Sequence, residues 1–175
     1  MSELNVRAMT LADVGATVSL YRTVAAVPGS GLARQSDEIS QDYVEGFLTR
    51  ATRSGLSLGA FVAGKLVGEI HATRLGPRQF DHVLTDLTVA VHPDAQGGGV
   101  GTRLFGALFE AATRLAGPVT RIELVARSGN GAALRLYERL GFRPEGRFQA
   151  RVALADGRVE DDIPMARILS VRGSA

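Results

Sequence analysis

The sequence predicts a mixed α/β domain whose sheet is mostly antiparallel and contains one parallel pair of strands. Two short turn sequences, Gly-Lys at 64–65 and Asp-Gly at 156–157, each lie between strand-like stretches and indicate antiparallel hairpins. A strand–helix–strand segment over 82–126 requires two parallel strands, because a helical crossover returns the chain in the same direction. The length of 175 residues is typical of one domain, and we expect a single domain over residues 1–175.

The first part of the chain is expected to form one strand and then two helices. Apolar and polar residues alternate over 4–9, which predicts a short strand. Thr10, followed by an aspartate in the first turn, predicts a helix that runs to about Val27, where a Pro-Gly-Ser-Gly stretch breaks the chain. A second helix is expected to open at 36–38, because the apolar residues after it are spaced to give one buried face.

The middle of the chain changes to the period of strands. Residues 58–63 and 66–72 flank the first hairpin turn, and 82–91 predicts a third strand. The end of this third strand is so apolar that we expect it to be buried on both faces.

A helix, a strand, a helix and a hairpin are expected to complete the domain. Apolar residues at helical spacing follow the glycines of 97–101, and a strand is expected over 121–126. Asn130 and Gly141 are typical of the start and the end of a helix. Strands over 148–154 and 158–169 are expected to form the last hairpin.

Composition excludes several classes of protein. Hydrophobic residues make up 45% and charged residues 22%, which is typical of a globular domain. The absence of cysteine excludes disulfides and thiolate chemistry, and three scattered histidines predict no metal site. The net charge of +2 comes from dispersed arginines, which argues against nucleic acid as a partner. No apolar run is long enough for a membrane span, and the acidic N-terminus is unlike a signal peptide, so we expect a cytoplasmic protein.

The sharpest chemical signal is segment 89–102, which reads as strand, glycine loop and helix. Backbone N–H groups at the start of a helix, approached closely through glycines, can bind a phosphate. A turn that only lets the strand pack on the helix is an equal alternative. The dinucleotide pattern fails because Leu104 stands at the third glycine position. A partial P-loop match at 59–65 fails because Leu66 replaces the Ser or Thr and the segment predicts a hairpin.

Two spaced motifs lie on either side of the strand expected over 121–126. They are Gln96-x-x-Gly99-x-Gly101 and Asn130-x-x-Ala133-x-x-Leu136-Tyr137-x-x-x-Gly141-Phe142. In these motifs, and in the order of elements along nearly the whole chain, the sequence resembles the GNAT superfamily of acyl-CoA N-acyltransferases. The resemblance implies that fold, with its parallel strand pair splayed apart. It also implies transfer of an acetyl group from acetyl-CoA to a primary amine, by direct attack through a tetrahedral intermediate.

The resemblance further implies where the cosubstrate acetyl-CoA binds. The strand before the glycine loop would pair with the pantetheine arm as an added strand would, and backbone amides of the loop would bind the pyrophosphate. Asn130 would contact the cosubstrate, and Tyr137 would lie beside the thioester sulfur. The expected cofactor-binding residues are Val89, Ala90, Val91, Gln96, Gly97, Gly98, Gly99, Val100, Gly101, Thr102, Asn130 and Tyr137.

Tyr137 and Asp86 are the expected catalytic residues. A phenol can protonate or hydrogen-bond a leaving thiolate, although a lone tyrosine at helical spacing is more often a core residue. Many relatives use an acidic residue in the strand before the glycine loop, and Asp86 takes that place. Between Leu84 and Leu87 an unpaired carboxylate would be costly, so we expect a partner or a raised pKa. A structural aspartate bonded to His82 is the equal alternative.

One departure from the superfamily concerns a glutamate. The branch that acetylates ribosomal proteins carries a glutamate where this sequence has Val125. Glu123, two residues earlier on the same strand face, is the alternative candidate for the base. His71 and His92 are expected at a strand edge or on the surface rather than as bases.

The expected acceptor is a small-molecule or peptide amine. An acyl-CoA-binding core over about 82–142 would be flanked by acceptor-side elements over about 11–54 and 148–169. Several acidic residues could attract a cationic amine or could simply be solvated, namely Asp42, Glu45, Glu69, Glu160, Asp161 and Asp162. A non-catalytic acyl-CoA-binding sensor or interaction module is the alternative function. A homodimer is expected because the edges of the last hairpin would otherwise stay unpaired.

Overall fold

The computed structural model describes residues 3–117 and 119–169, so residues 1–2, 118 and 170–175 of the expected domain lie outside it. The described residues form one mixed sheet in the order β1-β2-β3-β4-β5-β8-β6, and β7 also pairs with β8. The strands are β1 (Leu4–Ala8), β2 (Gly55–Val62), β3 (Lys65–Arg74), β4 (Val83–Val91), β5 (Arg121–Arg127), β6 (Arg143–Pro144), β7 (Phe148–Ala153) and β8 (Val159–Ile168).

The helices follow the expected order and lie close to the expected bounds. They are α1 (Val14–Ala25), α2 (Gln41–Ser54), α3 (Val100–Ala112) and α4 (Gly131–Arg139). The segments 11–13 and 36–38, expected as the first turns of α1 and α2, are separate 3₁₀ turns. None of the helices in the described ranges is both long and apolar enough to cross a membrane.

All strand pairings in the described residues are antiparallel except that of β4 with β5, which confirms the predicted class of fold. The first hairpin turns through Ala63 and Gly64, which both have positive φ (48° and 78°), so its turn lies one residue earlier than expected. Such a two-residue turn matches the right-handed twist of the strands it joins. Gly157, with φ of 85°, closes the second hairpin as predicted.

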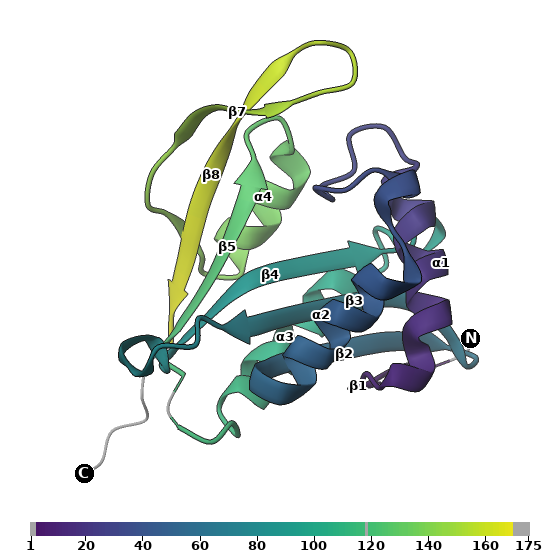
Figure 1. The fold of residues 1–175 in the computed structure, drawn as a ribbon, viewed down its shortest axis with the longest axis vertical. Coiled ribbons are helices and arrows are strands. Elements are labelled where there is room, and N and C mark those ends of the chain that lie inside the picture. Colours follow the sequence, from purple (N-terminus) through teal and green to yellow (C-terminus); the bar gives the residue numbers. More distant parts are fainter. Residues whose placement is uncertain (1–2, 118, 170–175) are drawn as a thin grey trace.

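Helices cover both faces of the first half of the sheet (Figure 1). α1 and α2 pack on one face of β2 and β3, and α3 packs on the other. Side chains alternate accordingly, because successive residues of a strand point to opposite faces. Ile70 and Ala72 join the core beneath α3, whereas Glu69 and His71 face α1 and α2.

A buried polar cluster joins α1 to β2 and β3. The Tyr21 hydroxyl donates to Oε2 of Glu69 at 2.6 Å, and Ser57 donates to Oε1 at 2.7 Å. Nδ1 of His71 lies 3.0 Å from Oε2 of Glu69, and Phe47 stacks on the His71 ring. Glu69 has no exposed surface and His71 is 5% exposed. The expectations of a surface His71 and of an accessible Glu69 are therefore wrong, because the two helices cover this face of β3.

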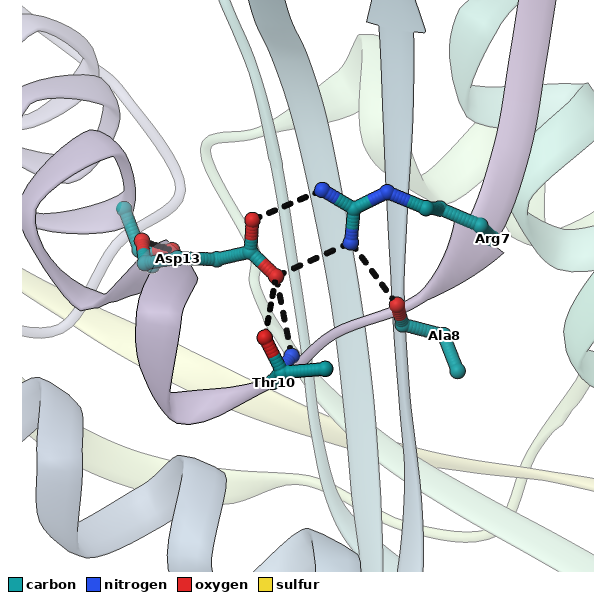
Figure 2. A network of polar contacts seen from close by, with 5 residues as sticks. Arg7, Ala8, Thr10 and Asp13 are labelled. Atoms are coloured by element: carbon teal, nitrogen blue, oxygen red, sulfur yellow. Dashed lines mark hydrogen bonds and ion pairs between the residues drawn. The ribbon is translucent and has the colours of Figure 1, made fainter.

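An ion pair fixes the start of α1 against β1. Figure 2 shows the Arg7 guanidinium bonded to both oxygens of Asp13, at 2.7 and 2.9 Å. Oδ2 of Asp13 also accepts from the backbone N–H of Thr10 and from its hydroxyl. One carboxylate therefore holds the strand end, the turn and the helix together.

β4 and β5 are paired only where they begin. Val83 pairs with Arg121 and Leu84 with Ile122, and beyond these positions the two strands diverge (Figure 1). Both strands keep their other neighbours, β3 and β8, along their length. The facing edges of β4 and β5 are therefore open, as the expected splayed pair requires.

Candidate active site

The gap between β4 and β5 opens into a cavity of about 1170 Å³. Ligand sites usually enclose about 300–1,000 Å³, so this cavity has room for more than one small molecule. We call the part of the lining that comes from the glycine loop, the end of β4, the start of α3 and α4 its first half. We call the part that comes from the connection between α1 and α2, from residues 85–86, from Glu145 and from β5, β7 and β8 its second half.

The glycine loop presents backbone N–H groups to the first half of the cavity. Gly97 and Gly99 have φ of 76° and 80°, in the left-handed region that favours glycine. α3 begins at Val100, and its first intrahelical bond runs from Arg103 N to Gly99 O. The N–H groups of residues 100–102 have no partner within the helix, and they lie at its positive end. This arrangement favours an anion such as a diphosphate.

The expected cofactor-binding residues mostly line this half. The end of β4 contributes Val89 and Val91, and the Gln96 amide donates to Val91 O at 3.2 Å, which ties the loop to the strand. Ala90 and Gly98 are not among the lining residues. Leu87 and Ala90 are buried in the cores on opposite faces of the sheet, as expected, whereas Val89 and Val91 are only half-buried. The divergence of β5 leaves that edge uncovered.

The start of α4 meets the connection between α1 and α2. The Oδ1 atom of Asn130 accepts from Ala133 N, which caps the helix as its position in the sequence predicts. A Cβ atom added at Gly31 would lie 2.9 Å from Nδ2 of Asn130. The two segments are therefore in close contact, and both line the cavity.

Tyr137 lies on α4 and lines the cavity. Its ring packs edge-on against Phe105 and Phe142, with centroid distances of 5.7 and 6.1 Å. Burial raises the pKa of the Tyr137 phenol to about 12. The phenol therefore carries its proton throughout the physiological range and can donate a hydrogen bond into the cavity.

Asp86 occupies a bulge in β4. Thr85 pairs with Thr73 and Thr88 pairs with His71, so three steps along β4 match two along β3. Asp86 has φ of 51°, the left-handed conformation in which aspartate is better tolerated than most residues. Its side chain is exposed and lines the cavity.

The expectation of a buried Asp86 is therefore wrong. The additional residue lets Leu84 and Leu87 both face the core, at 0% and 9% exposure, while Asp86 turns outward. The carboxylate needs no buried partner such as His82, whose own side chain is exposed.

The sequence matches the family model described as "Acetyltransferase (GNAT) family" over residues 27–142. The chain belongs to the GNAT acetyltransferase family. This match includes the glycine loop, β5 and α4, which all line the cavity.

Two relatives illustrate the likeness of this GNAT chain to known proteins. It is 35% identical to a mycothiol acetyltransferase of Frankia casuarinae over 115 residues, which are 65% of this chain and 31% of that protein. It is 38% identical to the N-alpha-acetyltransferase RimI of Mycobacterium tuberculosis over 102 residues, 57% of this chain and 60% of that protein. The chain thus spans from about a third to three-fifths of these two relatives.

A solved GNAT structure has the same fold. The phosphinothricin acetyltransferase of Sinorhizobium meliloti, in complex with acetyl-CoA, superposes with a TM-score of 0.83 at 21% identity. The match covers 97% of this chain and 89% of that one. GNAT relatives bind acetyl-CoA as a cosubstrate, and the described part of this GNAT chain holds no group of side chains suited to a metal ion.

The second half of the GNAT cavity contains an ion-pair cluster that the sequence did not reveal. Arg121 donates through Nε to Oε1 of Glu123 at 2.6 Å and through its two Nη atoms to both oxygens of Glu145. All three residues line the cavity. Arg121 and Glu123 share one face of β5, which their spacing could have indicated. Glu145 follows β6, and no pattern in the neighbouring sequence indicates that it belongs to this cluster.

The other acidic residues considered from the sequence do not line the GNAT cavity. Asp42 and Glu45 are exposed on α2, and neither lines it. Asp161 is paired with Arg147 and Asp162 with Arg151, within the last hairpin. The carboxylates that line the cavity come instead from β4, from β5 and from the residue after β6.

Proposed function

We propose that this chain is an acetyl-CoA-dependent N-acetyltransferase that acts on a primary amine by direct attack and without a metal. The observation that carries the proposal is the meeting of three features in one cavity. These are the anion-binding glycine loop, the open edge of β4, and the protonated phenol of Tyr137. An extended, amide-containing ligand with a diphosphate at one end fits the first two features, because strand edges pair with amides and helix starts bind phosphates.

Acetyl-CoA would supply the acetyl group as an activated thioester. We assign the pantetheine arm to the backbone of residues 89–91, and the diphosphate to the loop from Gln96 to Thr102, with Asn130 beside it. The half-buried side chains of Val89 and Val91 and the open edge of β4 support this assignment. Val100 can contact the diphosphate only through its backbone, because its side chain is buried.

Tyr137 is proposed to donate a hydrogen bond to the sulfur as the carbon–sulfur bond breaks. A phenol pKa of about 12 lies above that of a free thiol, about 8.5. Complete proton transfer to a free thiolate would therefore cost about 5 kcal/mol, so hydrogen-bond donation fits better.

Asp86 is proposed to accept the amine proton as the nitrogen–carbon bond forms. The proton then passes to solvent, to which the Asp86 side chain is exposed. Its position in the left-handed bulge supports this role, since strained backbone often marks functional residues. Glu123 is the weaker candidate, because Arg121 already donates to its carboxylate.

A Tyr137→Phe variant tests the proposal, because it removes one hydroxyl and keeps the ring. Turnover, followed as thiol release from acetyl-CoA, should fall by roughly 10²–10⁴, the usual effect of a positioned proton donor. CoA should still raise the melting temperature of the variant as it does that of the wild type. Tyr43→Phe, on α2 and outside the cavity, is the matched control.

Full turnover by Tyr137→Phe would contradict the proposed mechanism. A non-catalytic acyl-CoA-binding module is the second candidate, because binding needs only the loop and the strand edge. CoA-dependent stabilisation without thiol release on any amine in a broad library would favour that module.

Two finer proposals accompany this function. We place the enzyme in the cytoplasm, where acetyl-CoA is available, and we propose a homodimer through the outer edge of the last hairpin. Unpaired strand edges are usually covered or paired, which supports the dimer. A mass of about 18.5 kDa by light scattering at micromolar concentration would contradict it.

A further inference from the structure

We propose that the acceptor is a primary amine on an apolar skeleton that carries no carboxylate, and that the Arg121–Glu145 ion pair excludes amines that do carry one. This inference rests on the proposed acetyltransferase function and concerns the second half of the same cavity. The inference predicts that simple amines and α-amino amides are accepted and that free amino acids are not.

Exposed apolar side chains form the walls of this half. Val27, Val125 and Phe148 are 39%, 50% and 44% exposed, and all three line the cavity. They come from three separate elements, the connection after α1, β5 and β7. Pro164, which pairs with Val125 across β5 and β8, adds to the same wall. Exposed apolar groups that converge on one cavity are suited to an apolar part of a ligand.

Carboxylates are in excess beside these walls. Asp86, Glu123 and Glu145 line the cavity, against the two cations Arg121 and Arg139 that also line it. An ammonium group is attracted by this excess of negative charge, whereas a carboxylate is repelled.

Arg121 is not available to bind a substrate carboxylate. Its two Nη atoms are bonded to the two oxygens of Glu145, in the paired geometry by which arginine recognises carboxylates. Its Nε donates to Glu123. The cation that lies among these carboxylates is therefore already bound to two carboxylates of the protein itself.

Glu123 can still contact an ammonium group. Its Oε1 accepts from Arg121, and its side chain is about one-third exposed towards the cavity. Val125, two residues along the same face of β5, places an apolar surface beside it. A charged nitrogen next to an apolar group matches this pair of neighbours.

The test compares three ligands with the same phenyl group: 2-phenylethylamine, phenylalaninamide and phenylalanine. The amine of phenylalanine is intermediate in basicity between the other two, so basicity alone would rank it between them. We expect kcat/KM for 2-phenylethylamine and for phenylalaninamide to be at least tenfold higher than kcat/KM for phenylalanine. A tripeptide amide with N-terminal phenylalanine is assayed as well, and its kcat/KM distinguishes a peptide acceptor from a small-molecule acceptor.

Binding is measured separately from turnover, as affinity for the complex of the protein with CoA. The same ranking is expected there. If no amine is acetylated, the proposed function fails, and the binding ranking still decides this inference. Binding of phenylalanine as tight as that of phenylalaninamide would overturn it, and so would tighter binding of spermidine than of 2-phenylethylamine.

The variant Glu145→Ala gives a more specific test, because it removes the carboxylate that pairs with the guanidinium of Arg121. We expect the preference for phenylalaninamide over phenylalanine to fall at least tenfold in this variant, as Arg121 gains the substrate carboxylate as a partner. Glu138→Ala, an exposed glutamate of α4 outside the cavity, is the control and should keep the wild-type preference. An unchanged preference in a folded Glu145→Ala protein would contradict the role of the ion pair.

Discussion

The hydroxyl of Tyr21 donates a hydrogen bond of 2.6 Å to Oε2 of Glu69, a carboxylate that has no exposed surface. This bond joins α1 to β3, and α1 leads directly into the connection that lines the cavity at Val27. A buried carboxylate is tolerated only where hydrogen bonds compensate for lost hydration. The Tyr21–Glu69 bond therefore fixes the helix on which the acceptor side of the site depends.

Tyr21→Phe should lower the free energy of unfolding by about 1.5–3 kcal/mol, because it removes a donor to a buried charge. Burial, and then the neighbouring charge of Glu69, raise the pKa of Tyr21 well above its ordinary value of 10. A raised pKa contributes stability that is complete below pH 10 and is lost as the pH rises further. Chemical denaturation of the wild type should show this alkaline loss, and Tyr21→Phe should show less of it.

Tyr43→Phe is the control for this comparison, since Tyr43 is only half-buried on α2. If the wild type and Tyr21→Phe lost the same amount of stability at alkaline pH, the loss would come from another titrating group.

Asp13→Asn should weaken the junction of β1 and α1. The hydrogen bonds from Arg7 are the main cause that lowers the pKa of Asp13 from 3.8 to about 2. A lowered pKa contributes stability that is present above the unfolded value and is lost as the pH falls from about 4 through 2. Because Arg7 is partly exposed, we expect about 1–2 kcal/mol at neutral pH, measured by denaturation.

The exposed Asp42 of α2 offers the comparison, as Asp42→Asn removes a carboxylate of the same type. Asp13→Asn should also flatten the acid limb of stability between pH 4 and 2. An acid limb identical to that of the wild type would contradict the importance of the pair.

Gly99→Asp should abolish binding of CoA, because it adds a negative charge where the helix start would bind a diphosphate. Gly99 also has positive φ, so any side chain there strains the backbone. Gly157→Asp is matched for this strain, since Gly157 has φ of 85° and open space around it in the last hairpin turn. Calorimetric titration with CoA should find weak or no binding for the first variant and normal binding for the second. Normal binding by both would move the diphosphate to another part of the chain.

Substitutions of Asp86 should separate stability from activity. Asparagine tolerates the left-handed conformation, so Asp86→Asn should melt like the wild type while kcat/KM falls and the limb that requires a deprotonated base disappears. Asp86→Ala should be less stable than Asp86→Gly by about 1–2 kcal/mol, the cost of the left-handed conformation for a residue with a Cβ atom. Wild-type kcat/KM in Asp86→Asn would exclude Asp86 as the base.

Local patterns in the sequence predicted most of the fold. Periodicity located the main helices and strands, and positive-φ glycines at 99, 141 and 157 lie where a loop or cap was expected. The crossover from β4 through α3 to β5 predicted the parallel pair. These features depend on neighbours in the sequence, which is why a single chain reveals them.

Features set by distant residues could not be predicted. The bulge at Asp86 depends on the register of β4 against β3, and an aspartate in an apolar strand does not indicate an additional residue. Glu69 is buried because Tyr21, 48 residues away, covers it. Arg121 and Glu145 are 24 residues apart, and only the folding of α4 and β6 between them brings them together.

The divergence of β4 and β5 has a consequence for how copies of the protein meet one another. Unpaired strand edges act as templates for pairing with other chains and so promote aggregation. Here two such edges face each other inside one molecule, at a cavity that Gly31 and Asn130 also line. A strand of another copy would have to enter this cavity between β4 and β5 before it could pair. The interior of the sheet can thus offer its main-chain groups to a slender ligand without offering them to a neighbouring molecule.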